Sequence, residues 1–471
     1  MLFNSWAFGV FFLIVIALYL PRNRRWQNGV LLVSSYFFYG WWDWRFLGLL
    51  LVSTVVDFMV ARRMPKASGR GRRRLLMVSL AANLGILGFF KYFNFFIDST
   101  VVFLTELGLS ASAPVLNIVL PVGISFYTFQ TLAYTIDVYR GRIQPTSDIV
   151  QFAVYVSFFP QLVAGPIERA QHLLPQLSSP RRATAHQVRS GAALIFIGLT
   201  RKIAIADVAA PVVDRAFDDL ATANGLVVIA GVLLFSIQIY ADFAGYSDIA
   251  RGTARVLGID LMINFEHPYF ARNIAQFWRT WHISLSTWLR DYLYIPLGGN
   301  RHGRARTYRN LMLTMLLGGL WHGAAWTFVV WGAIHGVTLS IHRWWTETRP
   351  GPLTDAPYLP RRMISWLSTM FVVIAAWVFF RAPSISEAFD GIWSAATLRG
   401  GLDREALQSF ALFLSLITLL LVVDVPQMRK RSHTALLTWH PVARGFVYAA
   451  FILIMVAVPS AADIPFVYFQ F

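Results

Sequence analysis

The chain has 471 residues, of which 56% are hydrophobic and 14% charged, and its mean hydropathy is +0.53. Soluble domains average about 25% charged residues, and a single soluble core stops growing at about 250–300 residues. The composition therefore excludes a soluble enzyme, a disordered protein and a disulfide-stapled secreted domain, and it predicts an all-α polytopic membrane protein.

The net charge is +17, from 41 Lys and Arg against 24 Asp and Glu. The basic residues fall in short loops between apolar runs, which is typical of the positive-inside rule. We therefore expect the lipid bilayer, and no nucleic acid, among the partners. The chain has no cysteine, which excludes disulfides, thiolate metal ligands and a cysteine-linked acyl intermediate.

The first apolar run, Trp6–Leu20, is followed by arginines and has no basic residue before it, whereas a signal peptide has the opposite arrangement. It predicts an uncleaved span whose N-terminus lies outside. The third run, Trp44–Val60, leads to the most basic stretch, Arg62–Arg74, which we expect in the cytoplasm. The fourth run, Leu75–Ile97, returns outward to a loop, Asp98–Ala113, that has no Lys or Arg.

Later apolar runs continue the alternation and bring the expected number of full crossings to about ten. With the second run, they cover about 28–39, 115–136, 190–210, 226–240, 364–380, 409–423 and 445–458. Trp41, Trp42 and Trp44, which follow the second run, are typical of an aromatic belt at the membrane interface.

Two apolar stretches break the alternation, Ile149–Pro166 and Leu311–Ile341, because basic segments flank each of them on both sides. A full helical crossing needs about 20 residues, so the 31 residues of the second stretch are too few for two crossings and too many for one. We expect both stretches to be re-entrant or broken helices. Gly318, Gly319 and Gly323 are the expected break points in the second.

His322 lies at the centre of the second of these stretches, with glycines on both sides. An ionisable residue at membrane depth is costly and points to function, and imidazole suits proton transfer near neutral pH. From position alone, a core histidine bonded to a neighbouring carbonyl is an equally good interpretation.

His282 lies in a Trp-rich segment where Trp281 and Trp288 recur at helical spacing. This pattern predicts one amphipathic helix at the membrane interface, on which His282 is simply solvated. Alternatively, Arg279 and Arg290 attract an anionic donor such as a phosphopantetheine or coenzyme A phosphate.

His335 lies thirteen residues beyond His322, nearly on the opposite face of a continuous helix. The two could share a substrate only if the helix were broken. Gly332 and Gly336 form a small-residue motif around His335, which favours helix packing.

Asp242 and Asp248 end an earlier span. The interpretation we favour is a structural ion pair with Arg251 or Arg255, and the alternative is that they orient a histidine. Motifs of serine hydrolases, zincins, ATPases and dinucleotide-binding proteins are absent from the sequence, and nothing indicates a metal.

Short motifs follow one another in order over most of the chain and are densest within 117–345. They are Phe90–Phe93, Leu120–Tyr127, Phe159–Ile167, Gly198–Lys202, Tyr240–Asp248, Asn264–Trp278, Trp281–Trp288, Tyr294–Asn300, Gly319–Gly323 and Trp377–Ala382. Together they resemble the membrane-bound O-acyltransferase family, in particular its bacterial branch that acetylates alginate or D-alanylates teichoic acids. The loops and the last span match least.

The resemblance implies a single domain, 1–471, with a ring of about ten to twelve transmembrane helices around re-entrant helices and a cytoplasmic funnel. In that family the histidine of the Trp-His-Gly motif is catalytic, and here it is His322. The histidine of the Trp-His-x-Ser-Leu-Ser-x-Trp motif lines the same cavity, and here it is His282. Around them we expect further residues of the substrate or donor cavity: Trp321, Arg279, Trp281, Ser284, Asp242 and Asp248.

The function implied is transfer of an acyl group, acetyl in the alginate branch, across the bacterial inner membrane to an exported polysaccharide. No cofactor is expected to stay bound. A cytoplasmic acyl thioester, acetyl-CoA or an acyl carrier, is the expected donor, and an extracytoplasmic acyltransferase is the expected relay partner. The alternatives are D-alanyl transfer, long-chain acyl transfer to a lipid or protein, and a non-catalytic acyl carrier or scaffold.

Overall fold

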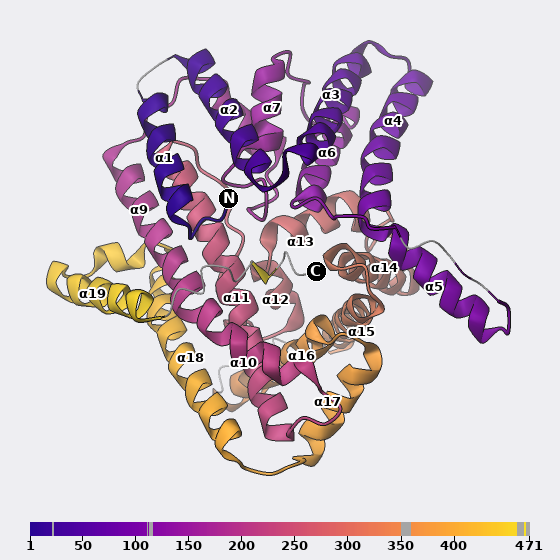
Figure 1. Ribbon diagram of the computed structural model, residues 1–471. Coiled ribbons are helices and arrows are strands. Elements are labelled where there is room, and N and C mark those ends of the chain that lie inside the picture. Colours follow the sequence, from indigo (N-terminus) through magenta and orange to yellow (C-terminus); the bar gives the residue numbers. More distant parts are fainter. Residues whose placement is uncertain (21–22, 111, 113–115, 350–358, 459–465, 468–471) are drawn as a thin grey trace. The chain divides into compact units, whose positions relative to one another are not determined.

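The computed structural model describes residues 1–20, 23–110, 112, 116–349, 359–458 and 466–467 (Figure 1). Its regular structure consists of the helices α1 to α19, joined in places by short 3-10 and π segments. The all-α prediction is therefore confirmed.

Several helices are long and apolar enough to cross a membrane, as judged by length and composition. Within the described ranges there are five such stretches: 24–66, 69–106, 225–256, 359–381 and 404–430. Two shorter helices, α1 (Trp6–Tyr19) and α19 (Pro441–Ala457), are also apolar. The membrane character is confirmed, while the number of about ten crossings stays a prediction.

The chain divides into two compact units. The first comprises Met1–Gly191 with Ala250–Met262, and the second comprises Ala192–Ile249 with Ile263–Phe471. Two helices, α9 (Ala185–Leu199) and α11 (Gly225–Val256), contribute residues to both.

The first unit is a set of helices, three of which are joined by a buried polar cluster. Besides α1, its helices are α2 (Arg24–Asp43), α3 (Leu47–Arg63), α4 (Gly69–Leu87), α5 (Phe93–Glu106), α6 (Ile124–Tyr139), α7 (Ile149–Ser157) and α8 (Ala170–Leu177). The buried Asp57 of α3 accepts hydrogen bonds from Ser79 Oγ (2.6 Å) and Asn83 Nδ2 (2.8 Å) of α4. Ser79 Oγ also contacts Thr135 Oγ1 of α6 (3.0 Å). Such hydrogen bonds tie helices together where lipid provides no hydrophobic drive for their association.

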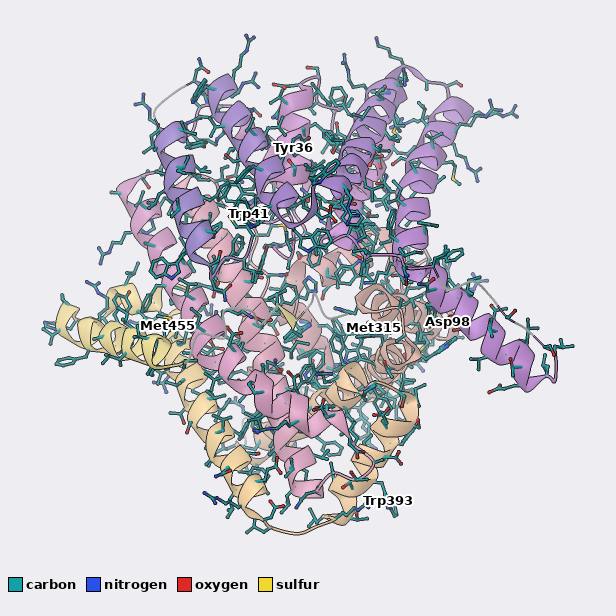
Figure 2. The ribbon with its side chains drawn as sticks, in the orientation of Figure 1. Tyr36, Trp41, Asp98, Met315, Trp393 and Met455 are labelled. Carbon is teal, nitrogen blue, oxygen red and sulfur yellow. The ribbon has the colours of Figure 1, made fainter. Side chains whose placement is uncertain are left out.

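The stretch Asp98–Ala113 differs from the loop we expected. Asp98, labelled in Figure 2, lies inside α5, which continues to Glu106, because the helical stretch that begins at Gly69 runs on without a break. Positions 111 and 113–115, where the next span was expected to start, lie outside the described residues.

The stretch Ile149–Pro166 is a broken helix, as predicted. Its helix α7 has nine residues, about 14 Å, and irregular buried backbone follows it. Gly123 sits against this backbone with φ of 77°, and a Cβ there would lie 2.7 Å from the Leu162 carbonyl oxygen. The short helix cannot cross a membrane, and the rest is protected by burial within protein.

The second unit holds the remaining helices and a buried ion network. Besides α19, its helices are α10 (Asp207–Asp218), α12 (Ile274–Thr280), α13 (Ile283–Leu289), α14 (Arg304–His322), α15 (Trp326–Thr348), α16 (Leu359–Arg381), α17 (Ile385–Thr397) and α18 (Arg404–Lys430). The buried Arg201 guanidinium pairs with Asp248 of α11 and Asp424 of α18. This arginine therefore links two long helices from within the unit.

The stretch Leu311–Ile341 is a helical hairpin, which confirms the predicted break. The helix α14 ends at His322 and α15 returns from Trp326, so Gly323 is at the break as expected. The two helices have 19 and 23 residues, about 28 and 34 Å, because polar turns at both ends extend the apolar run.

The glycines Gly318 and Gly319 do not break the helix, contrary to expectation, since both lie within α14. A Cβ on Gly319 would lie 2.2 Å from the Phe328 carbonyl oxygen, so this glycine allows close packing of the hairpin. Gly332 does the same against the carbonyl of Met315, which is labelled in Figure 2. The predicted small-residue packing of α15 is thereby confirmed.

Candidate functional site

His322 is the last residue of α14 and lies at the turn of the hairpin. Its side chain is buried, and only 4% of the residue is exposed. The imidazole meets Trp331 of α15 edge-to-face with ring centroids 5.1 Å apart, and Phe380 of α16 at 5.4 Å. Three helices therefore fix the place of this ring.

His282 lies in a sharp turn between α12 and α13. Its backbone is left-handed, with φ of 42°, and the residue is fully buried. The predictions of one continuous amphipathic helix and of a solvated histidine are both wrong. A non-glycine residue in this conformation costs about 1–3 kcal/mol and persists only where the surroundings enforce it.

Asn264 is the residue that enforces this turn. Its carbonyl oxygen accepts a hydrogen bond from Ile283 N (2.9 Å), and its side-chain Oδ1 accepts from the Ser284 hydroxyl (2.9 Å). Its Nδ2 donates to Ser247 Oγ of α11 (3.2 Å). One buried amide thus joins α11 to the start of α13 directly beside His282.

The two histidines lie close together in the second unit. Their ring centroids are 6.2 Å apart, and the Trp321 ring lies 5.8 Å from His282 and 5.0 Å from His322. Phe243 of α11 also contacts His282, with ring centroids 4.6 Å apart. The structure thus brings together His282, His322 and Trp321, three residues that the sequence analysis placed in one cavity.

Trp281 and Ser284 flank His282 and contact the surrounding scaffold. The Trp281 ring is fully buried and stacks on Phe277 with centroids 5.5 Å apart. The Ser284 side chain is bonded to Asn264. These contacts indicate that both residues hold the turn of His282 in place.

His335 contacts Trp331, the same ring that meets His322. Its ring is 4.7 Å from Trp331, and its Nδ1 accepts a hydrogen bond from Trp278 Nε1 (3.3 Å). Since an indole N–H can only donate, His335 is the neutral tautomer that carries its proton on Nε2. This geometry fits the packing interpretation, even though the helix between the two histidines is broken.

Asp242 and Asp248 form ion pairs, as favoured from the sequence, but with partners that the sequence analysis missed. Asp242 lies 3.0 Å from Lys202 Nζ, and Asp248 contacts Arg201. Arg255, one of the expected partners, lies instead at 3.3 Å from a different carboxylate, that of Asp260. The signal that could have found these pairs is the basic Gly198–Lys202 motif inside an apolar run.

Arg279 is exposed and lines a separate cavity of about 750 Å³ in the same unit. Arg272, His267 and Glu266 also line it, whereas His282 and His322 do not. We expected Arg279 to share a cavity with the two candidate catalytic histidines, but neither histidine lines the cavity that Arg279 lines.

In the first unit, a histidine is paired with a buried carboxylate. His172 Nδ1 is 2.7 Å from Glu168, whose carboxylate is buried and also accepts a hydrogen bond from Met262 N. The hydrogen bond that His172 donates to the Glu168 carboxylate raises the pKa of His172, whereas burial raises the pKa of Glu168. Among the described residues, no group of three His, Cys, Asp or Glu side chains is arranged to hold a metal ion.

Comparisons with known proteins connect this geometry with a reaction class. The model of the membrane-bound O-acyltransferase family matches residues 139–383, just over half of the chain. The chain is 42% identical to "Probable alginate O-acetylase AlgI" of Azotobacter vinelandii, over 83% of this chain and 77% of that protein. The matched family segment contains both His282 and His322.

Two other relatives are named for a different acceptor or a different acyl group. A peptidoglycan O-acetyltransferase of Helicobacter pylori is 37% identical over 80% of this chain and 75% of its own length. A teichoic acid D-alanyltransferase of Streptococcus thermophilus is 28% identical over 48% of this chain and 58% of its own length. The similarity is thus higher and longer for the acetyl-transferring relatives.

Proposed function

The chain belongs to the membrane-bound O-acyltransferase family, and we propose that it transfers acetyl groups to hydroxyls of an exported polysaccharide such as alginate. It is an integral membrane O-acyltransferase, placed in the bacterial inner membrane. The observation that carries the proposal is the pair of buried histidines, His282 and His322, with ring centroids 6.2 Å apart.

The general base in this proposal is His322. A hydroxyl is a poor nucleophile until its proton is removed, and a cysteine-free chain offers no thiolate intermediate. His322 takes the acceptor proton while the acceptor oxygen attacks the thioester carbonyl. The new C–O bond forms, the C–S bond breaks, and the proton passes from the imidazolium to the departing thiolate. The products are an ester and a free thiol, and His322 returns to its neutral form.

His282 is proposed to line the same reaction space and to orient the reactants. Its left-handed turn, held by Asn264, fixes the ring within reach of any group that also contacts His322. Orientation of this kind contributes to catalysis because reacting atoms must be about 3–3.5 Å apart.

The donor is proposed to be a cytoplasmic acyl thioester, acetyl-CoA or an acyl carrier. Arg272 and Arg279 line the cavity of about 750 Å³, and guanidinium groups suit the phosphates that both donors carry. On the outer side, we propose that an extracytoplasmic acyltransferase receives the acetyl group and passes it to the polysaccharide.

The test is the acyl content of the exported polymer in a strain that lacks the chain and in the same strain complemented with it. We expect ester-linked acetyl to disappear on deletion and to return on complementation. Ester-linked D-alanine that follows the chain instead would favour the teichoic-acid type of reaction, and loss of a long acyl chain from lipid or protein would favour long-chain acyl transfer.

The non-catalytic carrier or scaffold predicts something different. In that case His322→Ala at normal abundance would retain acyl transfer, because moving acyl groups without chemistry needs no base. Loss of transfer with unchanged abundance would exclude the scaffold.

A further inference from the structure

A basic cavity of about 700 Å³ opens beside the C-terminal end of α3. Its lining combines three cations, Arg62, Arg63 and Lys66, with apolar side chains that include Phe58 and Met59. All of these residues belong to the first unit, whereas the candidate catalytic histidines belong to the second. The proposed acyl transfer therefore gives this cavity no role.

The three cations are exposed and are not neutralised by the protein. No ion pair with a carboxylate of the described chain is found for Arg62, Arg63 or Lys66. The Arg62 guanidinium lies 5.4 Å from the centroid of the Phe58 ring, and Arg63 Nη1 lies 3.8 Å from Met59 Sδ. The two arginines therefore lie along the apolar wall of the cavity.

Two other arginines of the same unit are paired with carboxylates. Arg24 lies 3.3 Å from Asp148, and Arg142 lies 3.5 Å from Asp137. Cations near an acidic residue are thus paired with it. The cavity instead gathers three cations without an acid, which leaves their charge for an anion from outside the chain.

An exposed apolar stripe leads along the helices to this cavity. Val52, Val55 and Met59 recur on one face of α3 and are 50%, 41% and 43% exposed. Met77 and Val78 of α4, which packs beside α3 (Figure 1), are 54% and 52% exposed. In a membrane-spanning chain such surfaces face acyl chains, and the cations at the helix end lie at the level of lipid headgroups.

We propose that this cavity binds the headgroup of an anionic phospholipid, with the phosphate between Arg62, Arg63 and Lys66. Basic pockets at the ends of transmembrane helices suit such headgroups, and arginine offers a fork of donors to phosphate oxygens. The lipid's acyl chain lies along the stripe that ends at Met59. Neither free phosphate nor an acidic soluble protein has an acyl chain that could lie along this stripe. The surface therefore favours a lipid as the occupant.

The test uses the purified full chain in neutral detergent micelles that contain phosphatidylcholine. The micelles are titrated with phosphatidylglycerol, and inorganic phosphate is added in a parallel series. Bound lipid is counted by native mass spectrometry, and Tm is followed in the same samples. Three cations near a headgroup predict that phosphatidylglycerol binds on the order of 100-fold more tightly than phosphatidylcholine and raises Tm.

Two triple variants remove the same charge from the same region of the chain. The cavity variant is Arg62→Gln, Arg63→Gln and Lys66→Gln, and the control variant is Arg70→Gln, Arg73→Gln and Arg74→Gln. The cavity variant should lose the preference for phosphatidylglycerol and its Tm shift, whereas the control should keep both. Equal behaviour of the two variants, or a wild-type chain without the preference, would overturn the proposal.

Two further outcomes would assign the cavity to another ligand. If inorganic phosphate raises Tm as much as phosphatidylglycerol does, and only when the cavity cations are present, the site is a free-anion site. If the cavity variant keeps its lipid preference but loses acyl transfer in cells, the cations serve an acidic donor protein. Either result would reject the lipid proposal.

Discussion

The imidazole rings of His282 and His322 lie 6.2 Å apart although forty residues separate them in the chain. Each ring is placed by a break between two helices: His322 at the turn of the α14–α15 hairpin, and His282 in the left-handed turn between α12 and α13. Two local interruptions of helix therefore create one buried site. Irregular backbone of this kind is tolerated at membrane depth only where protein or a water-filled cavity surrounds it.

Replacement of His282 by alanine should lower acyl transfer by about 10-fold or more without loss of the protein from the membrane. The imidazole lies beside His322, so its removal changes the reaction space directly. The measurement is acyl content of the exported polymer at matched protein abundance. Activity within about a factor of two of wild type would mean that the ring only packs against Phe243.

Asn264→Ala should reduce activity through His282, because it removes the acceptor that holds Ser284. A buried hydrogen-bonding group left without its partner costs about 1–3 kcal/mol, so a loss of Tm is also expected. The matched control is Ser247→Ala, which removes the other hydrogen bond of the Asn264 side chain and leaves the turn of His282 intact. Equal loss of kcat in the two variants, at equal Tm, would argue against a positioning role for Asn264.

The sequence predicts the helical hairpin well but not the turn at His282. The hairpin is predictable because the basic residues that flank it and the glycine at its break lie within or next to it in the sequence. At His282 the Trp281 and Trp288 spacing continues across the turn as if a helix ran through it, and the turn depends on Asn264, which lies eighteen residues away.

The same reason applies to the ion pairs of α11. Asp242 and Asp248 can be recognised in the sequence as acids within an apolar run, but their partners Lys202 and Arg201 lie 40 and 47 residues earlier. Nearness in the sequence favoured Arg251 or Arg255 as the partner, whereas tertiary packing brings the more distant cations Lys202 and Arg201 to these carboxylates. Such choices are made by the fold and cannot be read from spacing alone.

The topology can be tested on this cysteine-free chain with single introduced cysteines. Ser68 is the N-cap of α4 and lies within the basic stretch that we expect in the cytoplasm, and Ser110 follows α5. A membrane-impermeant thiol reagent applied to intact cells should label Ser110→Cys and spare Ser68→Cys until the cells are opened. Labelling of Ser68→Cys in intact cells would reverse the orientation.

The His172–Glu168 pair predicts a pH dependence of stability. The Glu168 hydrogen bond raises the pKa of His172, so the folded state binds this proton more tightly than the unfolded state does. The stabilisation is then fully present below the ordinary histidine pKa and is lost as the pH rises through the raised pKa of His172. As the pH rises through this range, the Tm of the wild type should fall relative to the Tm of the His172→Gln variant. Parallel Tm curves for the two proteins would show that the pair contributes nothing.

The central claim is that His322 is the base for the attacking hydroxyl, and its most direct measurement is acyl content of the exported polymer with His322→Gln at matched abundance. Glutamine keeps much of the size and a hydrogen-bonding end but cannot accept a proton near pH 7. Transfer should fall at least about 10²-fold, whereas His335→Gln, at a residue that packs against Trp278 and Trp331, should act far less or only through abundance. Substantial acylation with glutamine at 322 would contradict the general-base role and the assignment of the active site.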